Sequence, residues 1–122
     1  MFGSVKKTVQ LAGKVLEVIW SKRVDKVLVA RQVPLIVEMR LEYRCMPTKV
    51  VSFPDRAPDN ALVAQVTGKL VVAWSETMLD HCGTGGRVAD SLKDPVSHGG
   101  RKMPRRLTID FANGEWRGEY SF

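Results

Sequence analysis

A strict alternation of apolar and charged residues between Pro34 and Arg44 constrains the fold of this chain more than any other feature. The odd-numbered positions from Leu35 to Tyr43 are all apolar, and from Glu38 onward the even-numbered positions are all charged. Successive side chains of a β-strand point to opposite faces, so this pattern predicts a half-buried strand of about ten residues. The chain must therefore build a sheet with one face on a core.

The C-terminal segment predicts a β-hairpin. Apolar residues alternate with polar ones from residue 107 to 111, and Asn113-Gly114 is a dipeptide favoured in two-residue type I′ turns. The predicted register places Phe111 opposite Trp116 and Leu107 opposite Tyr120. The chain is therefore expected to stay structured up to this end.

The middle of the chain is less uniform. Residues 50–53 form a short strand candidate before Pro54, and the apolar run 70–75 predicts a buried strand. Asn60 can cap a short helix over 61–66 that ends at Gly68, and this helix is preferred to a strand over the same residues. Residues 27–29 fit either a strand or the end of a preceding helix.

The first 26 residues place positive charges among apolar residues at helical spacing, which predicts an amphipathic helix over residues 1–26. Six cations and two acidic residues give this segment a net charge of +4, out of +6 for the whole chain. The expected apolar side comprises Val5, Val9, Ala12, Leu16, Ile19 and Trp20. The cations are Lys6, Lys7, Lys14, Lys22, Arg23 and Lys26.

Together these patterns predict an α+β fold in one domain, residues 1–122. The N-terminal amphipathic helix is followed by a β-rich core over 27–122, with a mostly antiparallel sheet of four to six strands, one short helix and the C-terminal β-hairpin. The glycine-rich stretch 79–105 is expected to be a long loop. The 44% hydrophobic and 26% charged residues are typical of a globular protein.

The basic composition, with a pI near 9.6, favours an acidic partner. The predicted helix can lie on an anionic membrane with its lysines on lipid phosphates. The alternative is a helix packed on its own domain with a solvated basic back. A second cluster precedes the C-terminal hairpin and fits either a phosphate clamp or a solvated connector; it comprises Arg101, Lys102, Arg105 and Arg106.

Neither a secretory signal nor an apolar run of roughly 20 residues is present, so an intracellular protein is expected, soluble or peripheral to a membrane. Cys45 and Cys82 lie far apart in no metal-like or redox-like spacing, which favours free thiols, although a disulfide between them stays open.

The stretch 80–86 contains the one arrangement suggestive of catalysis, because a histidine and a cysteine precede several glycines. A thiol nucleophile there would need a base such as His98, since His81 is adjacent to Cys82 in sequence. The stretch also lacks the Gly-Lys-Ser/Thr ending of a phosphate loop. A zinc site made of Cys45, His81, Cys82 and His98 has the wrong spacing. No catalytic residue, metal or cofactor is therefore expected.

The opening segment resembles the basic N-terminus of rhabdovirus matrix proteins. The matching positions are Ser4, Lys6, Lys7, Leu11, Gly13 and Lys14. The resemblance implies a membrane-directed viral structural or accessory protein, associated with a virion and with a nucleocapsid-type partner. The chain lacks that family's proline-rich budding motifs and is much shorter, and its N-terminal segment is expected to be helical rather than flexible.

These observations predict a non-enzymatic structural or interaction protein that associates with an anionic membrane surface and forms homo-oligomers or contacts a protein partner. The expected binding residues are Lys6, Lys7, Lys14, Lys22, Arg23, Arg101, Lys102, Arg105 and Arg106. A nucleic-acid-binding protein that uses the same charges on phosphates is the alternative. A small cysteine hydrolase is the third hypothesis.

Overall fold

The computed structural model describes residues 3–43, 46–78 and 103–122. Eight strands and one helix are present in this part of the chain, and the helix lies between the second and third strands. Their bounds are β1 Ser4–Leu11, β2 Lys14–Ser21, α1 Lys22–Ala30, β3 Leu35–Tyr43, β4 Pro47–Ser52, β5 Leu62–Thr67, β6 Leu70–Met78, β7 Arg106–Ala112 and β8 Glu115–Ser121.

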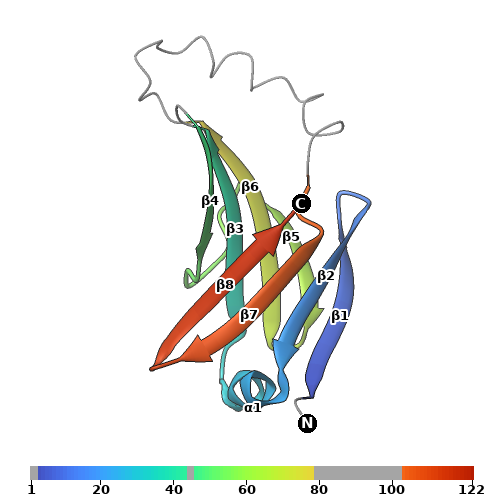
Figure 1. Cartoon of the computed structure of the whole chain (residues 1–122), viewed down its shortest axis with the longest axis vertical. Coiled ribbons are helices and arrows are strands. Elements are labelled where there is room, and N and C mark those ends of the chain that lie inside the picture. Colours follow the sequence, from blue (N-terminus) through green and yellow to red (C-terminus); the bar gives the residue numbers. More distant parts are fainter. Residues whose placement is uncertain (1–2, 44–45, 79–102) are drawn as a thin grey trace.

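The strands form two mixed four-stranded sheets that face each other (Figure 1). We call them sheet A, with the order β1-β2-β7-β8, and sheet B, with the order β4-β3-β6-β5. Neighbouring strands are antiparallel except at the centre of each sheet, where β2 pairs with β7 and β3 pairs with β6 in parallel. The α+β prediction with one mostly antiparallel sheet is therefore wrong, and the described chain is mostly β.

The predicted N-terminal helix over residues 1–26 is also wrong, because residues 4–21 form the β1–β2 hairpin. Ala12 and Gly13 make its turn, both with positive φ (50° and 81°). Residues four apart, such as Val5 and Val9, share a face in a strand as well as in a helix, so their spacing did not distinguish the two. The many β-branched residues of this segment favour strands.

Helix α1 begins where the hairpin ends. Ser21 is its N-cap, and its hydroxyl oxygen accepts a hydrogen bond from Val24 N at 3.1 Å. Val24 and Leu28, one turn apart, are buried against the sheets. The helix is therefore docked by its apolar face, but it covers residues 22–30 and is not the helix predicted over residues 1–26. Residues 27–29 belong to this helix.

Other local predictions have mixed outcomes. The strand predicted after Pro34 is confirmed as β3, and the strand over 70–75 lies within β6. The C-terminal hairpin is confirmed with its register, including Phe111 opposite Trp116 and positive φ at Asn113 and Gly114. The helix preferred over 61–66 is wrong, because Leu62–Thr67 is β5, whose apolar residues pack beside β6.

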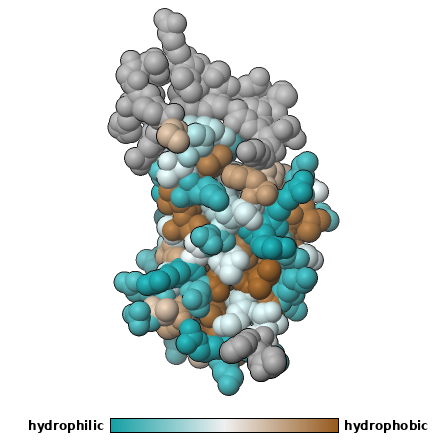
Figure 2. Space-filling model, in the orientation of Figure 1, coloured by the Kyte–Doolittle hydropathy of each residue, from teal (hydrophilic) through white to brown (hydrophobic). Residues whose placement is uncertain are grey.

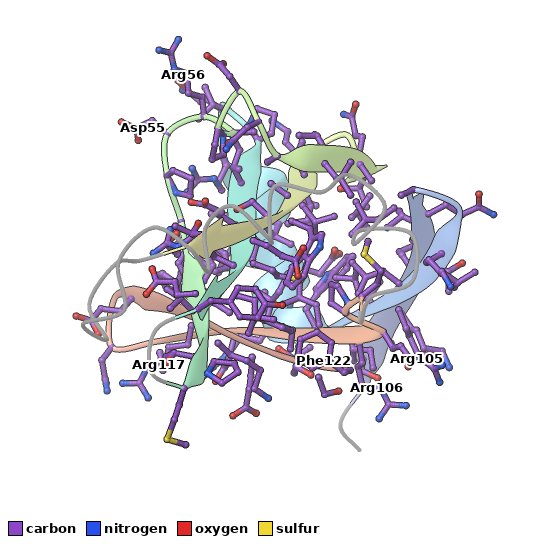
Figure 3. All side chains as sticks on the ribbon, turned by 90° about the horizontal axis from the view of Figure 1, so that it is seen from above. Asp55, Arg56, Arg105, Arg106, Arg117 and Phe122 are labelled. Atoms are coloured by element: carbon purple, nitrogen blue, oxygen red, sulfur yellow. The ribbon has the colours of Figure 1, made fainter. Side chains whose placement is uncertain are left out.

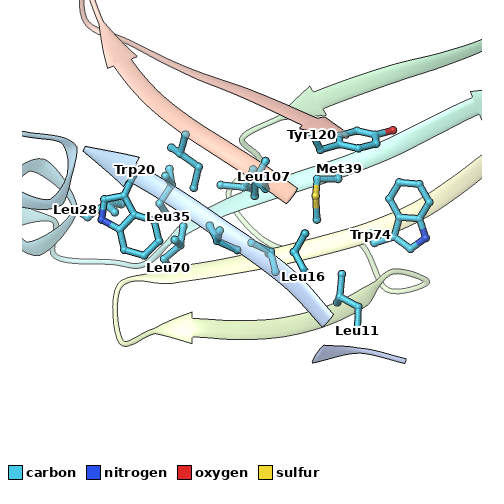
Figure 4. Close-up of a cluster of buried hydrophobic side chains, with 14 of the residues drawn as sticks. Leu11, Leu16, Trp20, Leu28, Leu35, Met39, Leu70, Trp74, Leu107 and Tyr120 are labelled. Atoms are coloured by element: carbon cyan, nitrogen blue, oxygen red, sulfur yellow. The ribbon is translucent and has the colours of Figure 1, made fainter. Parts of the chain in front are cut away.

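One hydrophobic core lies between the sheets, and α1 closes it at one end (Figure 4). Its largest fully buried side chains are Trp20 from β2 and Trp74 from β6. The described residues at the end of the predicted loop 79–105 also contribute, since Met103 is buried in the core. The rest of that loop, residues 79–102, lies outside the described part.

Strand β8 of sheet A packs against sheet B. Gly118 lies so close to β4 that an added Cβ would be 2.8 Å from Val51 Cγ1. The buried Tyr120 hydroxyl donates a hydrogen bond to the backbone oxygen of Arg40 in β3 at 2.7 Å. Burial raises the pKa of the Tyr120 phenol above its usual value. The packing of β8 against sheet B therefore requires a small residue at position 118 and a neutral hydroxyl at position 120.

A candidate basic surface at the α1 end

The cations predicted to form one binding face are dispersed. Lys6 and Lys7 are neighbours on β1 and therefore point to opposite faces of sheet A. Lys14 begins β2, whereas Lys22 and Arg23 follow its other end, so these residues lie at opposite ends of the same strand. The structure brings together Lys22 and Arg23 but separates them from Lys14.

The second predicted cluster is described only in part, because Arg101 and Lys102 lie outside the described residues. Arg105 and Arg106 are exposed and lie together at the start of β7 (Figure 3). Arg106 Nε donates to Glu17 Oε1 at 2.9 Å, and Lys6 Nζ lies 3.3 Å from Glu17 Oε2. Partial desolvation opposes ionisation of Glu17, but these two cations hold the pKa of its carboxyl below the usual value. Two of the predicted cations, Lys6 and Arg106, therefore form ion pairs with Glu17 across sheet A.

The exposed side of α1 carries a denser basic cluster. Lys22, Arg23 and Lys26 are all exposed there. The acidic residue of the helix, Asp25, is turned toward the core side, where its Oδ1 accepts a hydrogen bond from Trp20 Nε1 at 3.0 Å. The outward face of α1 therefore presents three cations and no carboxylate of its own.

Two exposed valines follow these cations in the chain. Val29, in the last turn of α1, is 63% exposed, and Val33, in the segment that leads to β3, is 61% exposed. Together with Lys22, Arg23, Lys26 and Arg31 they make up what we call the α1 surface. Figure 2 shows hydrophilic surface interrupted by hydrophobic residues at this lower end of the molecule.

Neighbouring residues hold the two arginines of the α1 surface in place. Arg23 donates to the backbone oxygen of Phe111 at 3.0 Å and lies 3.8 Å from the Asp110 carboxylate. Arg31 donates to the Val33 carbonyl at 3.2 Å, and its guanidinium lies 6.0 Å from the centre of the Trp116 ring. These contacts hold Arg23 and Arg31 against the β7–β8 hairpin.

The C-terminal end of α1 receives a further cation from the β5–β6 turn. Lys69 Nζ donates a hydrogen bond to the carbonyl oxygen of Arg31. Carbonyl groups at a helix C-terminus carry partial negative charge and are stabilised by such a cation. Positive charge therefore surrounds α1 at both of its ends.

Sequence reasoning identified Lys22 and Arg23 but missed most of the α1 surface. Arg31 and Val33 gave no periodic signal, and Val29 was expected either in a strand or at the end of a helix. A helical wheel restricted to residues 22–30 would have placed Val29 beside Lys22 and Lys26, opposite Val24 and Leu28. The wrong helix boundaries concealed this arrangement.

The carboxylates of β3 form a further charged cluster. Arg40 lies between Glu38 and Glu42, with nitrogen–oxygen distances of 3.5 Å and 2.8 Å. Ser52 donates a further hydrogen bond to Glu38 at 3.0 Å. Because both carboxylates are engaged by Arg40 or Ser52, this cluster stabilises the face of sheet B and does not resemble a catalytic acid–base pair.

The described residues contain no group of three or more metal-binding side chains close enough to hold an ion. The predicted thiol stretch 80–86, His98 and Cys45 lie outside the described part of the chain, so the hydrolase and zinc alternatives gain nothing from the structure. In residues 3–43, 46–78 and 103–122, the helical structure is too short and too polar to cross a bilayer.

Comparisons with models of protein families, with curated proteins and with solved structures found no match to this chain. The resemblance of its first residues to rhabdovirus matrix proteins therefore stays a prediction.

Proposed function

We propose that this protein attaches without catalysis to an anionic membrane surface, and that it does so through the α1 surface rather than through an N-terminal helix. The observation that carries the proposal is that two exposed valines, Val29 and Val33, follow the exposed cations of α1 in the chain. A nucleic acid would use the cations on its phosphates but offers the valines no apolar layer. A phospholipid surface offers both, because phosphates lie directly above acyl chains.

The charges favour a weak interaction. A lysine or arginine close to an anionic bilayer contributes about 1 kcal/mol. Because Asp110 offsets the charge of Arg23, the other three cations of the α1 surface would supply roughly 3 kcal/mol, which corresponds to weak, reversible attachment before the apolar contribution is added. Binding should weaken as salt increases, because exposed charges are screened.

Co-sedimentation with vesicles tests the proposal. The full chain is mixed with phosphatidylcholine vesicles, with or without phosphatidylserine, at low salt. The wild type should bind only the anionic vesicles. The double variant Lys22→Glu/Lys26→Glu changes the charge of α1 by four units, so it should lose roughly 1,000-fold in affinity and remain in the supernatant.

The matched control is Lys14→Glu/Arg105→Glu, which makes the same charge change at residues remote from α1. Both side chains are exposed. This variant should still sediment with anionic vesicles, only modestly less than the wild type. Loss of binding in the control but not in the α1 variant would overturn the proposal. Binding of RNA that survives removal of lipid and displaces the vesicles would favour the nucleic-acid alternative instead.

A further inference from the structure

We infer that Val29 and Val33 enter the interfacial layer of the anionic bilayer, so that the molecule stands on its α1 end with the helix parallel to the membrane plane. This inference rests on the proposed function and adds a mode of attachment to it. Electrostatic contact alone would leave both valines in water and would not fix the orientation of the molecule.

The position of α1 suits this orientation. The helix lies at one end of the described chain, and Figure 1 views it nearly along its axis while the strands run up the page. The helix axis therefore runs across the long direction of the two sheets. A helix in such a position can lie flat on a surface without bringing either sheet face into contact with it.

The distribution of side chains around α1 matches an interfacial helix of this kind. Steps of 100° per residue place Lys22, Lys26 and Val29 within about one sixth of a turn. Val24 and Leu28 lie on the opposite side, in the core. Lys26, one turn before Val29, can extend its apolar stem past this valine and keep its ammonium group at the phosphate level.

Two other exposed valines lie on strands rather than at the α1 end. Val15 is 57% exposed and directly follows Lys14 at the start of β2, far from α1 along that strand. Val63 is 51% exposed on β5, and no lysine or arginine lies between Leu62 and Thr67. Among the exposed valines of the described residues, Val29 and Val33 are therefore the two at the α1 end.

The aromatic residues beneath Arg31 support insertion at the same end. Trp116 lies under the Arg31 guanidinium and contacts Phe111, with 4.7 Å between the ring centres, and Phe53, at 6.4 Å. All three rings are only partly buried. Tryptophan beside cations is typical of the boundary between headgroups and acyl chains.

Fluorescent labels at single cysteines test the inference. In a full-length chain with Cys45→Ser and Cys82→Ser, an environment-sensitive probe is attached at Val29→Cys or Val33→Cys, with Val15→Cys and Val63→Cys as matched exposed controls. On addition of phosphatidylserine-containing vesicles, probes at 29 and 33 should shift to the blue and be quenched by lipids that carry a shallow spin label. Probes at 15 and 63 should not change.

A second measurement avoids any effect of the probe. Val29→Ala/Val33→Ala, without a label, should bind anionic vesicles about tenfold more weakly than the wild type, because burial of the removed methyl groups is lost. An unchanged circular dichroism spectrum shows that this surface variant is folded.

The outcomes separate this inference from the proposed function. Vesicle binding by the wild type with unshifted probes at 29 and 33, or with unchanged affinity of the double alanine variant, overturns insertion and leaves electrostatic attachment standing. A blue shift confined to position 15 or 63 overturns the orientation. Absence of vesicle binding by the wild type removes the proposed function and the inference with it.

Discussion

Adjacent residues on α1 should respond very differently to the same truncation. Leu28 is 2% exposed and packs in the core, whereas Val29 is 63% exposed. Leu28→Ala removes buried carbon atoms and leaves a cavity, so we expect it to lower the free energy of unfolding by about 3 kcal/mol. Val29→Ala should change it by no more than about 0.5 kcal/mol, because alanine favours the helix and little packing is lost.

The change should be visible in thermal unfolding. With an unfolding entropy of about 2.1 cal/mol/K per residue, 122 residues give about 0.26 kcal/mol/K. A loss of about 3 kcal/mol then lowers Tm by roughly 12 °C for Leu28→Ala, and Val29→Ala should shift Tm by about 2 °C at most.

Thermal melts and urea titrations, each followed by circular dichroism, provide the measurement. The urea midpoint of Leu28→Ala should fall while its m-value stays that of the wild type, because the surface exposed on unfolding is nearly the same. Equal shifts for the two variants, or a larger shift for Val29→Ala, would refute the docked arrangement of α1.

Three further predictions concern β8 and the start of α1. Gly118→Ala should cost about 1–3 kcal/mol because its Cβ meets Val51, and a second change, Val51→Ala, should recover part of this loss in a double-mutant cycle followed by urea unfolding. Tyr120→Phe should cost about 1 kcal/mol at neutral pH, since the Arg40 carbonyl loses its donor. Burial raises the pKa of Tyr120 in the folded state, so the wild type should lose stability as pH rises above about 10, where the unfolded phenol ionises, and Tyr120→Phe should lose less. Ser21→Ala should cost about 1 kcal/mol in thermal unfolding, because it removes the N-cap hydroxyl.

The parts of the fold that the sequence predicted are those with local causes. The alternation that begins at Leu35 has a period that only a strand satisfies, and Asn113-Gly114 fixes the register of its hairpin through turn geometry. The β1–β2 hairpin was missed because Val5 and Val9 fit both periods, while Ala12-Gly13 is a less distinctive turn sequence. The parallel pairings could not be predicted from the sequence, because no local pattern in β2 indicates that β7 will lie beside it.

The candidate site also combines features with local causes and features set by contacts between distant segments. Lys22 and Arg23 were identified by charge alone, whereas their separation from Lys14 follows from the hairpin that sequence reasoning missed. Exposure of Val29 depends on which side of α1 the sheets cover. That information comes from packing between distant segments and not from hydrophobicity.

The parallel pairing of β2 with β7 has a consequence for how the chain is made. Glu17 and Arg106, joined across these strands, are 89 residues apart in sequence. At 5–20 residues per second, roughly 4–18 s of synthesis separate the two strands. During that interval β2 has β1 on one side and an unpaired backbone edge on the other, which is a template for another chain. During synthesis, sheet A is therefore the last sheet to complete its strand pairing. When several ribosomes translate one mRNA, the unpaired edge of β2 should favour mispairing between neighbouring nascent chains.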